Sequence, residues 1–433
     1  MPRILLLNEN PAAPNWGAQA MSYAMKRILQ DAMPDVALVP ISHSWLVKEF
    51  RRWRFWPHRL FEAGAAVPAF TYALSRRLSS ATEFFPQIVD DFERIATRWC
   101  RGEGGPLAAE FLTAVGNSDV IVHNGEHQIY RNSREGCRAL FLLWLARTRL
   151  HKPSCEVNHT AHLTSVIPIM PGMVKLVYPL LDVVTVREPS SLDNLRALGI
   201  TNASLVPDPV FYLDPAEFSE TRAAEWKRAT GLSGRQYFCL SASALPMSGP
   251  RGGWKGEVVA LVERLKRVVP QGVLIAKDKS CQFLREVAQA TNVAYFGPEH
   301  DFTELWPLLR DASFLVSGHY HYVIMASMVA CPFVPLSTTS HKMEGLCRLL
   351  NWHNTRPHDA TSLCTVADAI VAEASEIQRD RDHYAQHLRQ RSVVLRQHAS
   401  ANGVRIREAF QPSARGGRPT FAEAALGGAA VAP

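Results

Sequence analysis

Apolar runs and amphipathic segments alternate along most of the chain, which is the pattern of a parallel sheet covered by helices. The first apolar run, residues 3–7, leads through a polar loop into a segment with apolar residues at helical spacing. A second apolar run follows at 36–41. A strand, a helix and a second strand in this order form one βαβ unit, so the opening segment predicts an α/β fold.

The alternation is interrupted between about 45 and 100 and then resumes. The interrupted region carries helical patterns, and we interpret it as a helical insertion. An amphipathic connector at 214–236 divides the remaining strands into two groups. The further strands that we expect lie at 118–125, 155–160 and 183–188 in the first group and at 237–243, 272–278, 293–297, 314–318 and 333–336 in the second.

Two such groups predict two Rossmann-like, doubly wound domains that face a cleft, with ligands outside the carboxyl ends of the strands. We expect the N-terminal domain over 1–213, including the insertion of about 45–100, and the C-terminal domain over 236–400. Residues 412–433 are rich in Pro, Gly and Ala and are expected to form a disordered tail.

Composition narrows the class of protein without choosing a function. The chain is 47% hydrophobic and 20% charged, as in soluble globular proteins, and its net charge of +7 favours acidic partners. No apolar run reaches the roughly 18 residues of a membrane-spanning helix, and no secretion signal is visible. The eight cysteines include no C-x-x-C pair, which favours reduced thiols. We expect a cytoplasmic protein.

Two histidines follow the strand at 314–318. Ser317 and Gly318 end that strand, and His319 and His321 stand at the start of a Met- and Ala-rich helix. Backbone N–H groups at a helix start suit an anion, and an imidazole adds a donor that can also carry a proton near neutral pH. The alternative is that both histidines only cap the helix and pack.

Other strand ends carry polar residues. Arg187 suits a forked grip on a carboxylate or phosphate, although it could equally form a structural ion pair. Asn124 and Glu126 follow the strand at 118–125, where Glu126 could act as a base toward a hydroxyl. Asp208 lies between two prolines and most simply shapes a turn.

Helix starts and basic segments supply weaker candidates. Asn15 and Gly17 could present backbone amides to a phosphate or sugar, although the loop lacks the G-x-G-x-x-G fingerprint of dinucleotide binding and could be only a turn. Lys277 and Lys342 are single cations near a strand end and a helix start. Residues 48–61 interleave basic and aromatic side chains, which predicts either peripheral contact with anionic lipid or a helix packed on the domain. No motif supports nucleic-acid binding.

The order of these features resembles the polysaccharide pyruvyl transferase family. The resemblance rests on "NWG" before the first helix, "SDVIVHNG", "TVREPSS", "VPDPVFYL" and "SGHYHYVIMASMVACPFVPL", and it covers most of 3–352 outside 45–100. It implies a GT-B-like fold and an enzyme that transfers pyruvate from phosphoenolpyruvate onto a sugar as a ketal. It also implies that Arg187 and His321 fall on anion-binding and catalytic positions, with Lys342 near the same cleft.

The implied chemistry explains these residue types. Phosphoenolpyruvate carries a carboxylate and a phosphate, which arginine, lysine and helix starts can hold. Protonation of its methylene carbon creates a centre that sugar hydroxyls attack while phosphate leaves, and His321 is the candidate acid. The resemblance implies no metal and no cofactor besides the donor substrate. The acceptor is expected to be a saccharide, which could be linked to lipid or nucleotide.

Departures from the family pattern keep two alternatives open. The family usually has arginine where this chain has His319, an acidic residue near Ala18 and Gln19, and a glycine-rich turn near 123–127. A protonated His319 would replace the arginine in part. The alternatives are a GT-B-type glycosyltransferase that uses a nucleotide sugar and a non-catalytic, saccharide-binding member of the family.

Overall fold

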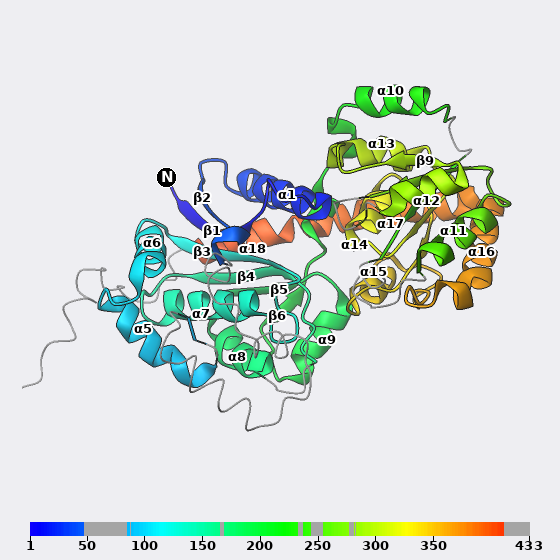
Figure 1. Ribbon diagram of the computed structural model, residues 1–433. Helices are drawn as coiled ribbons and strands as arrows, with labels where there is room; N and C mark the ends of the chain where they lie inside the picture. The colour runs from blue at the N-terminus through cyan, green and yellow to red at the C-terminus, as the bar shows by residue number, and fades with distance from the viewer. Residues whose placement is uncertain are drawn as a thin grey trace, which may run out of the picture.

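Two parallel sheets organise the chain. The computed structural model describes residues 1–46, 85–86, 88–164, 169–232, 237–243, 254–276, 281 and 283–410. The first sheet has the strand order β2-β1-β3-β4-β5-β6 and the second has the order β11-β10-β7-β8-β9. All of the strand pairs in both sheets are parallel. Figure 1 shows the sheets in separate lobes, which confirms the predicted α/β class.

The inner strands of the first sheet, β1, β3, β4 and β5, are buried on both faces, as expected where helices cover a parallel sheet, whereas its edge strands β2 and β6 are mostly half-buried. Its strand order reverses between β1 and β3, so the loops that follow these strands diverge and leave room at their carboxyl ends. The strands are β1 (Arg3–Glu9), β2 (Ala37–Ser42), β3 (Val120–Glu126), β4 (Ser154–His159), β5 (Val183–Val186) and β6 (Ala203–Leu205).

Helices cover both faces of the first sheet (Figure 1). The helices before the connector are α1 (Trp16–Ala32), α2 (His43–Leu46), η2 (Val89–Asp91), α5 (Phe92–Cys100), α6 (Gly105–Gly116), α7 (Arg134–Thr148), α8 (Ile169–Val177), η3 (Tyr178–Leu180) and α9 (Pro189–Ala197). In the predicted insertion, the described residues form the end of α2, η2 and α5. Residues 48–61 lie outside the described residues, as do Lys277 and 412–433.

The connector contains η4 (Pro209–Tyr212), η5 (Pro215–Glu217) and α10 (Thr221–Ala229). The second sheet reverses its order between β7 and β10. Its strands are β7 (Tyr237–Ser241), β8 (Gln271–Ile275), β9 (Ala294–Phe296), β10 (Leu315–Ser317) and β11 (Phe333–Pro335). Its helices are α11 (Trp254–Leu265), α12 (Phe283–Thr291), η7 (Phe302–Glu304), α13 (Leu305–Arg310), α14 (Tyr320–Met328), α15 (Lys342–Leu350) and α16 (Leu363–Arg379).

The last two described helices return the chain to the first lobe. Helix α17 (Arg381–Ala399) packs against α14, and α18 (Ala401–Phe410) packs against α1 and the first sheet, as Figure 1 shows in red. Asn402 accepts a hydrogen bond from the Thr185 hydroxyl at 2.7 Å. The expected domain ranges, 1–213 and 236–400, did not include α18, because an amphipathic pattern does not say which sheet a helix covers.

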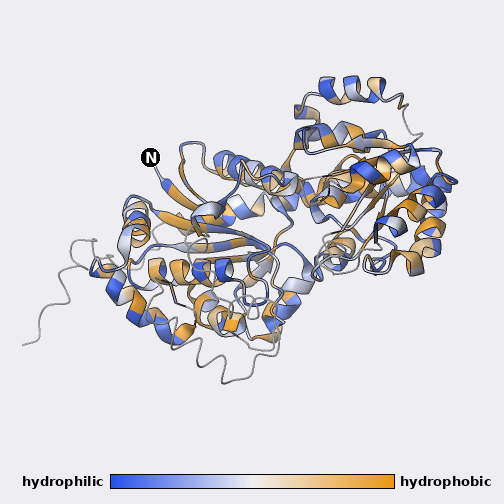
Figure 2. Ribbon diagram, in the orientation of Figure 1, coloured by the Kyte–Doolittle hydropathy of each residue, from blue (hydrophilic) through white to orange (hydrophobic). Residues whose placement is uncertain are grey.

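Helix α1 also contacts the second lobe. The Trp16 ring is buried against Phe296 at 5.6 Å and Tyr322 at 6.0 Å between ring centroids. Figure 2 shows apolar residues concentrated on the strands and on the inward sides of the helices. No helix among the described residues is long and apolar enough to cross a membrane.

We expect the substitution Ile406→Ala to destabilise the first lobe by about 2–5 kcal/mol, because Ile406 on α18 is fully buried with Ile4 and Leu6 of β1. Urea denaturation monitored by circular dichroism would measure this loss. The control Val404→Ala removes a side chain that is 38% exposed on the same helix and should change stability by less than about 0.5 kcal/mol. Equal effects would contradict a core role for α18.

Candidate functional site

Arg187 follows β5 and points into a buried ion pair. Its Nε donates to the Thr160 hydroxyl at 3.0 Å, and its Nη1 donates to Asp208 Oδ2 at 2.9 Å. The guanidinium carbon lies 4.7 Å from the centre of the Tyr320 ring. Because Arg187 is only 1% exposed, it serves in this arrangement as the ion-pair partner that the sequence left open as an alternative. Its role toward a ligand stays a prediction.

Asp208 joins the two lobes. Its Oδ1 accepts from the Val210 N–H at 3.0 Å, which is the predicted turn, while Oδ2 lies between Arg187 and His321 Nε2. Burial alone would raise the pKa of Asp208, but His321 and Arg187 lower it to about 2. Asp208 is therefore a carboxylate at neutral pH. The sequence reasoning missed this contact, because a turn already explained an aspartate between two prolines.

His321 lies on the first turn of α14 and is 17% exposed. Its Nε2 is 3.5 Å from Asp208 Oδ2, which is long for a hydrogen bond. Burial lowers the pKa of His321 below its usual value, and the Asp208 carboxylate opposes part of that shift. The imidazole is therefore mostly neutral at pH 7 and becomes a good proton donor only when negative charge is added beside it.

Asn15 and Gly17 were predicted to present backbone amides to a ligand, but in the structure they make contacts within the protein. Asn15 Oδ1 caps α1 by accepting from the Gly17 N–H at 2.9 Å, so that N–H already has a partner. Gly17 instead lies directly against His321, because a Cβ added there would be 2.3 Å from the imidazole Nδ1. The glycine is needed for this close approach of the two lobes.

Glu126 ends β3 with φ of 46°, a left-handed conformation that turns the chain sharply at the strand end. Burial raises the pKa of Glu126 to about 7, against the opposing charge of Arg187. A carboxyl group with this pKa can give or take a proton at neutral pH. The structure thus brings the predicted base into the electrostatic range of the Arg187–Asp208 pair.

Asn124 is fully buried two residues before Glu126. Its carbonyl oxygen accepts from Asn8 Nδ2 at 2.7 Å, and its side-chain oxygen accepts from Asn158 Nδ2 at 2.9 Å. These bonds tie the ends of β1, β3 and β4 together. Asn124 therefore supports the strand ends, and its role toward a ligand stays a prediction.

Ser317, Gly318 and His319 pack on β7. Ser317 Oγ and His319 Nδ1 lie 2.7 Å and 3.0 Å from Ser241 Oγ, and a Cβ on Gly318 would lie 2.4 Å from Ser243 Cβ. His319 is the N-cap residue of α14 and is 8% exposed. The His319 side chain makes no capping hydrogen bond to α14 and bonds to β7 instead, which favours the packing alternative for His319, whereas His321 faces the other lobe.

Lys342 is the first residue of α15 and is partly exposed. Its charge lowers the pKa of Glu126, although burial and other groups have larger effects there. It also helps to lower the pKa of His127 and of His321, although burial has the larger effect on both. Lys342 is therefore close enough to all three groups to affect an anion bound among them.

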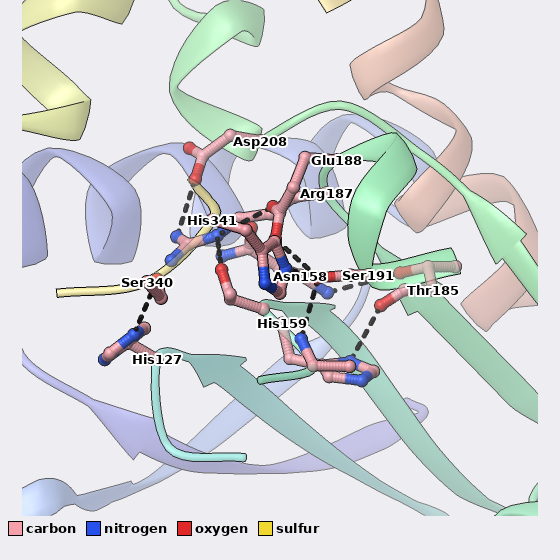
Figure 3. Close-up of polar contacts among 12 residues, drawn as sticks. His127, Asn158, His159, Thr185, Arg187, Glu188, Ser191, Asp208, Ser340 and His341 are labelled. Atoms are coloured by element: carbon pink, nitrogen blue, oxygen red, sulfur yellow. Dashed lines mark hydrogen bonds and ion pairs between the residues drawn. The ribbon is translucent and has the colours of Figure 1, made fainter. Parts of the chain in front are cut away.

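A seam of loops beside these groups joins the lobes. Tyr130 stacks between His127 and His162, with ring centroids 4.4 Å and 5.1 Å away. Hydrogen bonds across the seam connect His127 to Ser340 (3.1 Å), His162 to His341 (3.2 Å), Ser191 to His341 (3.1 Å) and Tyr130 to the Thr339 carbonyl (3.4 Å). Figure 3 shows the His127–Ser340 contact close to the Arg187–Asp208 pair. No spacing in the sequence predicted this seam.

A buried pair lies beneath Glu126. His123 Nδ1 and Glu156 Oε2 are 2.7 Å apart, and His123 Nε2 lies 2.9 Å from Gln128 Oε1. Burial alone would lower the pKa of His123, but Glu156 and Gln128 raise it above its usual value. Among the described residues, no group of three or more His, Cys, Asp or Glu side chains is arranged to hold a metal ion.

Comparisons with known proteins identify the family and the fold of the chain. Residues 15–341 match the polysaccharide pyruvyl transferase family, and this range covers well over half of the chain. The chain belongs to this family. Its members are enzymes, so the chain is assigned to the transferases. A comparison with curated protein sequences finds no match.

The solved structures that resemble the chain show the fold. The S. aureus MnaA–UDP structure has a TM-score of 0.52 and 11% identity, with 90% of this chain and 91% of that chain covered. The UDP-GlcNAc 2-epimerase from Neisseria meningitidis bound to UDP-GlcNAc has a TM-score of 0.50 and 11% identity, with 95% and 99% covered. These similarities confirm the predicted GT-B-like fold of the family member.

We expect Asp208→Ala to destabilise the protein by about 3–5 kcal/mol, because it leaves the buried Arg187 without its carboxylate. Urea unfolding would measure the loss. Asp193→Ala is the control, since Asp193 forms a 3.4 Å pair with Arg348 in which both side chains are about half exposed. That pair is worth at most about 1 kcal/mol. Similar losses in the two variants would contradict the buried-pair assignment.

Proposed function

We propose that this family member transfers pyruvate from phosphoenolpyruvate to two hydroxyls of a saccharide as a ketal. The observation that carries the proposal is the meeting of His321 from one lobe with Asp208 from the other, with Arg187 and Lys342 acting electrostatically on both His321 and Glu126. Such a site contains two groups that exchange protons and two cations for an anionic donor.

In the proposed first step, His321 gives its proton to the methylene carbon of phosphoenolpyruvate. The donor is a polyanion, and its negative charge beside the imidazole would raise the pKa of His321 and load the proton. Asp208 would stabilise the imidazolium before transfer and hold the ring in place. A new C–H bond forms, and the neighbouring carbon becomes electron-poor.

In the proposed next steps, the saccharide hydroxyls attack that carbon. The first hydroxyl forms a C–O bond and passes its proton to Glu126, and the C–O bond to phosphate breaks. The second hydroxyl then attacks the same carbon and closes the ketal, and its proton leaves with the released phosphate as hydrogen phosphate. Glu126 returns its proton to solvent while His321 regains one, which restores the site. Glu126 suits this role because its pKa of about 7 leaves a large fraction ionised at neutral pH.

The direct test mixes the purified protein with phosphoenolpyruvate and a panel of saccharides, including lipid-linked and nucleotide-linked ones. We expect release of inorganic phosphate together with a saccharide that carries a pyruvate ketal, detected by mass spectrometry and NMR. Parallel reactions replace phosphoenolpyruvate with nucleotide sugars. Glycosyl transfer in those reactions, without ketal formation, would favour the glycosyltransferase alternative. Saccharide binding without any transfer would favour the binding-protein alternative.

We expect His321→Ala to lower the rate of ketal formation by about 10²- to 10⁴-fold, the usual contribution of a general acid, with little change in melting temperature. A phosphate-release assay and differential scanning fluorimetry would measure both effects. The control is His398→Ala, which changes an exposed histidine on α17 and should keep the wild-type rate. Wild-type turnover by the His321 variant would remove His321 from the mechanism.

The pH dependence distinguishes the two possible roles of Glu126. If Glu126 is the base, kcat/KM should fall as the pH drops below about 7, because the carboxyl group becomes protonated. This limb should be absent from the profile of Glu126→Gln, whose residual rate should be low. A fall in kcat/KM as the pH rises above 7, lost in the same variant, would instead make Glu126 the acid.

A further inference from the structure

Tyr320 has a buried hydroxyl group without a hydrogen-bond partner among the described residues. The residue begins α14, is 3% exposed, and packs its ring on the guanidinium of Arg187. Two other fully buried tyrosines are satisfied: Tyr237 donates to the Leu308 carbonyl at 2.6 Å, and Tyr178 bonds to His159 at 2.9 Å. A buried polar group without a partner costs about 1–3 kcal/mol, so the unpaired Tyr320 hydroxyl calls for an explanation.

The surroundings of Tyr320 are those of the candidate site. Arg187, Glu188 and Asp208 of the first lobe act electrostatically on its hydroxyl, and His321 is the next residue. Burial raises the pKa of Tyr320 well above its usual value. The hydroxyl therefore keeps its hydrogen at any working pH and is available as a hydrogen-bond donor.

Oxygen atoms of Glu126 and Glu188 also lack hydrogen-bond partners in the described part of the chain. A carboxylate oxygen can accept from a hydroxyl, but neither glutamate forms a hydrogen bond with Tyr320 in the structure, so they do not satisfy the tyrosine. A hydroxyl donor gains most from a charged acceptor such as a carboxylate or phosphate oxygen. Arg187, on the face of the same ring, favours negative charge at this place.

We propose that the Tyr320 hydroxyl binds an anionic oxygen of the donor substrate and turns the donor toward His321. The inference rests on the proposed function and adds a substrate-contacting residue to it. A donor fixed between the Arg187 face of the ring and the first turn of α14 would present its carbon to the adjacent imidazole. A misplaced donor would bind more weakly and react less often.

The test compares Tyr320→Phe with Tyr237→Phe. Tyr320→Phe keeps the ring on Arg187 and removes only the hydroxyl. We expect KM and Kd for phosphoenolpyruvate to rise about 10- to 100-fold, as for the loss of a hydrogen bond to a charged group, while the melting temperature is unchanged or higher. Tyr237→Phe loses a satisfied hydrogen bond on β7, so it should lower the melting temperature and leave KM unchanged.

Calorimetric titrations with phosphoenolpyruvate, oxalate and inorganic phosphate identify the anionic group. Weaker oxalate binding by Tyr320→Phe would assign the hydroxyl to the donor carboxylate, and weaker phosphate binding would assign it to the donor phosphate. Wild-type KM and Kd values in Tyr320→Phe would overturn the inference and leave an internal water as the partner. If the wild-type protein itself binds no phosphoenolpyruvate, the proposed function fails, and the Tyr320 assignment fails with it. That outcome is distinguishable from a failure of the Tyr320 assignment alone, in which the wild-type protein and Tyr320→Phe bind phosphoenolpyruvate equally well.

Discussion

The buried carboxylate of Asp208 is the constraint on which the rest of the site depends. A buried charge is costly unless it is paired, and Asp208 pairs with Arg187 in its own lobe and faces His321 in the other. Arg187 lowers the pKa of Asp208 from within the same lobe, and His321 lowers it further from the other lobe. The proton affinity of His321 also depends on the approach of the lobes, because only that approach places the carboxylate beside the imidazole.

The fold could be predicted from the sequence because the spacing of apolar residues identifies each element locally. Runs such as those in β1 and β3 are too short and too apolar for helices, and their alternation with amphipathic segments permits few arrangements besides a parallel sheet. The return of α18 to the first lobe could not be predicted in this way. It depends on contacts such as Asn402 with Thr185, which are 217 residues apart.

The candidate site was harder to predict, because the same residue types bind ligands, cap helices and pack at strand ends. Gly17, Asn124 and Ser317 were singled out for their positions, and each is used within the protein. The sequence predicted only a turn for Asp208 and no role for Tyr320, yet both residues lie where the lobes meet. Only long-range contacts distinguish the residues that are used within one lobe from those that lie between the lobes. The position of a residue along a strand predicts which end of the sheet its side chain lies near, whereas its contacts with the other lobe decide its role.

The seam next to the site shows how the lobes can meet without adding charge. The Ser191 hydroxyl gives its one hydrogen to Glu188 at 2.5 Å, so His341 Nε2 must donate to Ser191. If His341 is neutral, its Nδ1 must then accept from His162 Nδ1. Burial and the nearby His341 lower the pKa of His162 to about 4, which agrees with a neutral ring.

A protonated imidazole has two donors and no acceptor. One added proton on His341 would therefore only reverse the direction of its bond to His162, whose neutral ring would become the acceptor. Two protons would break the bond. With both rings neutral, the lobes are held here by uncharged hydrogen bonds, which cost less to bury than ions. The charged side chains lie instead in and around the Arg187–Asp208–His321 group, where an anionic substrate would interact with them.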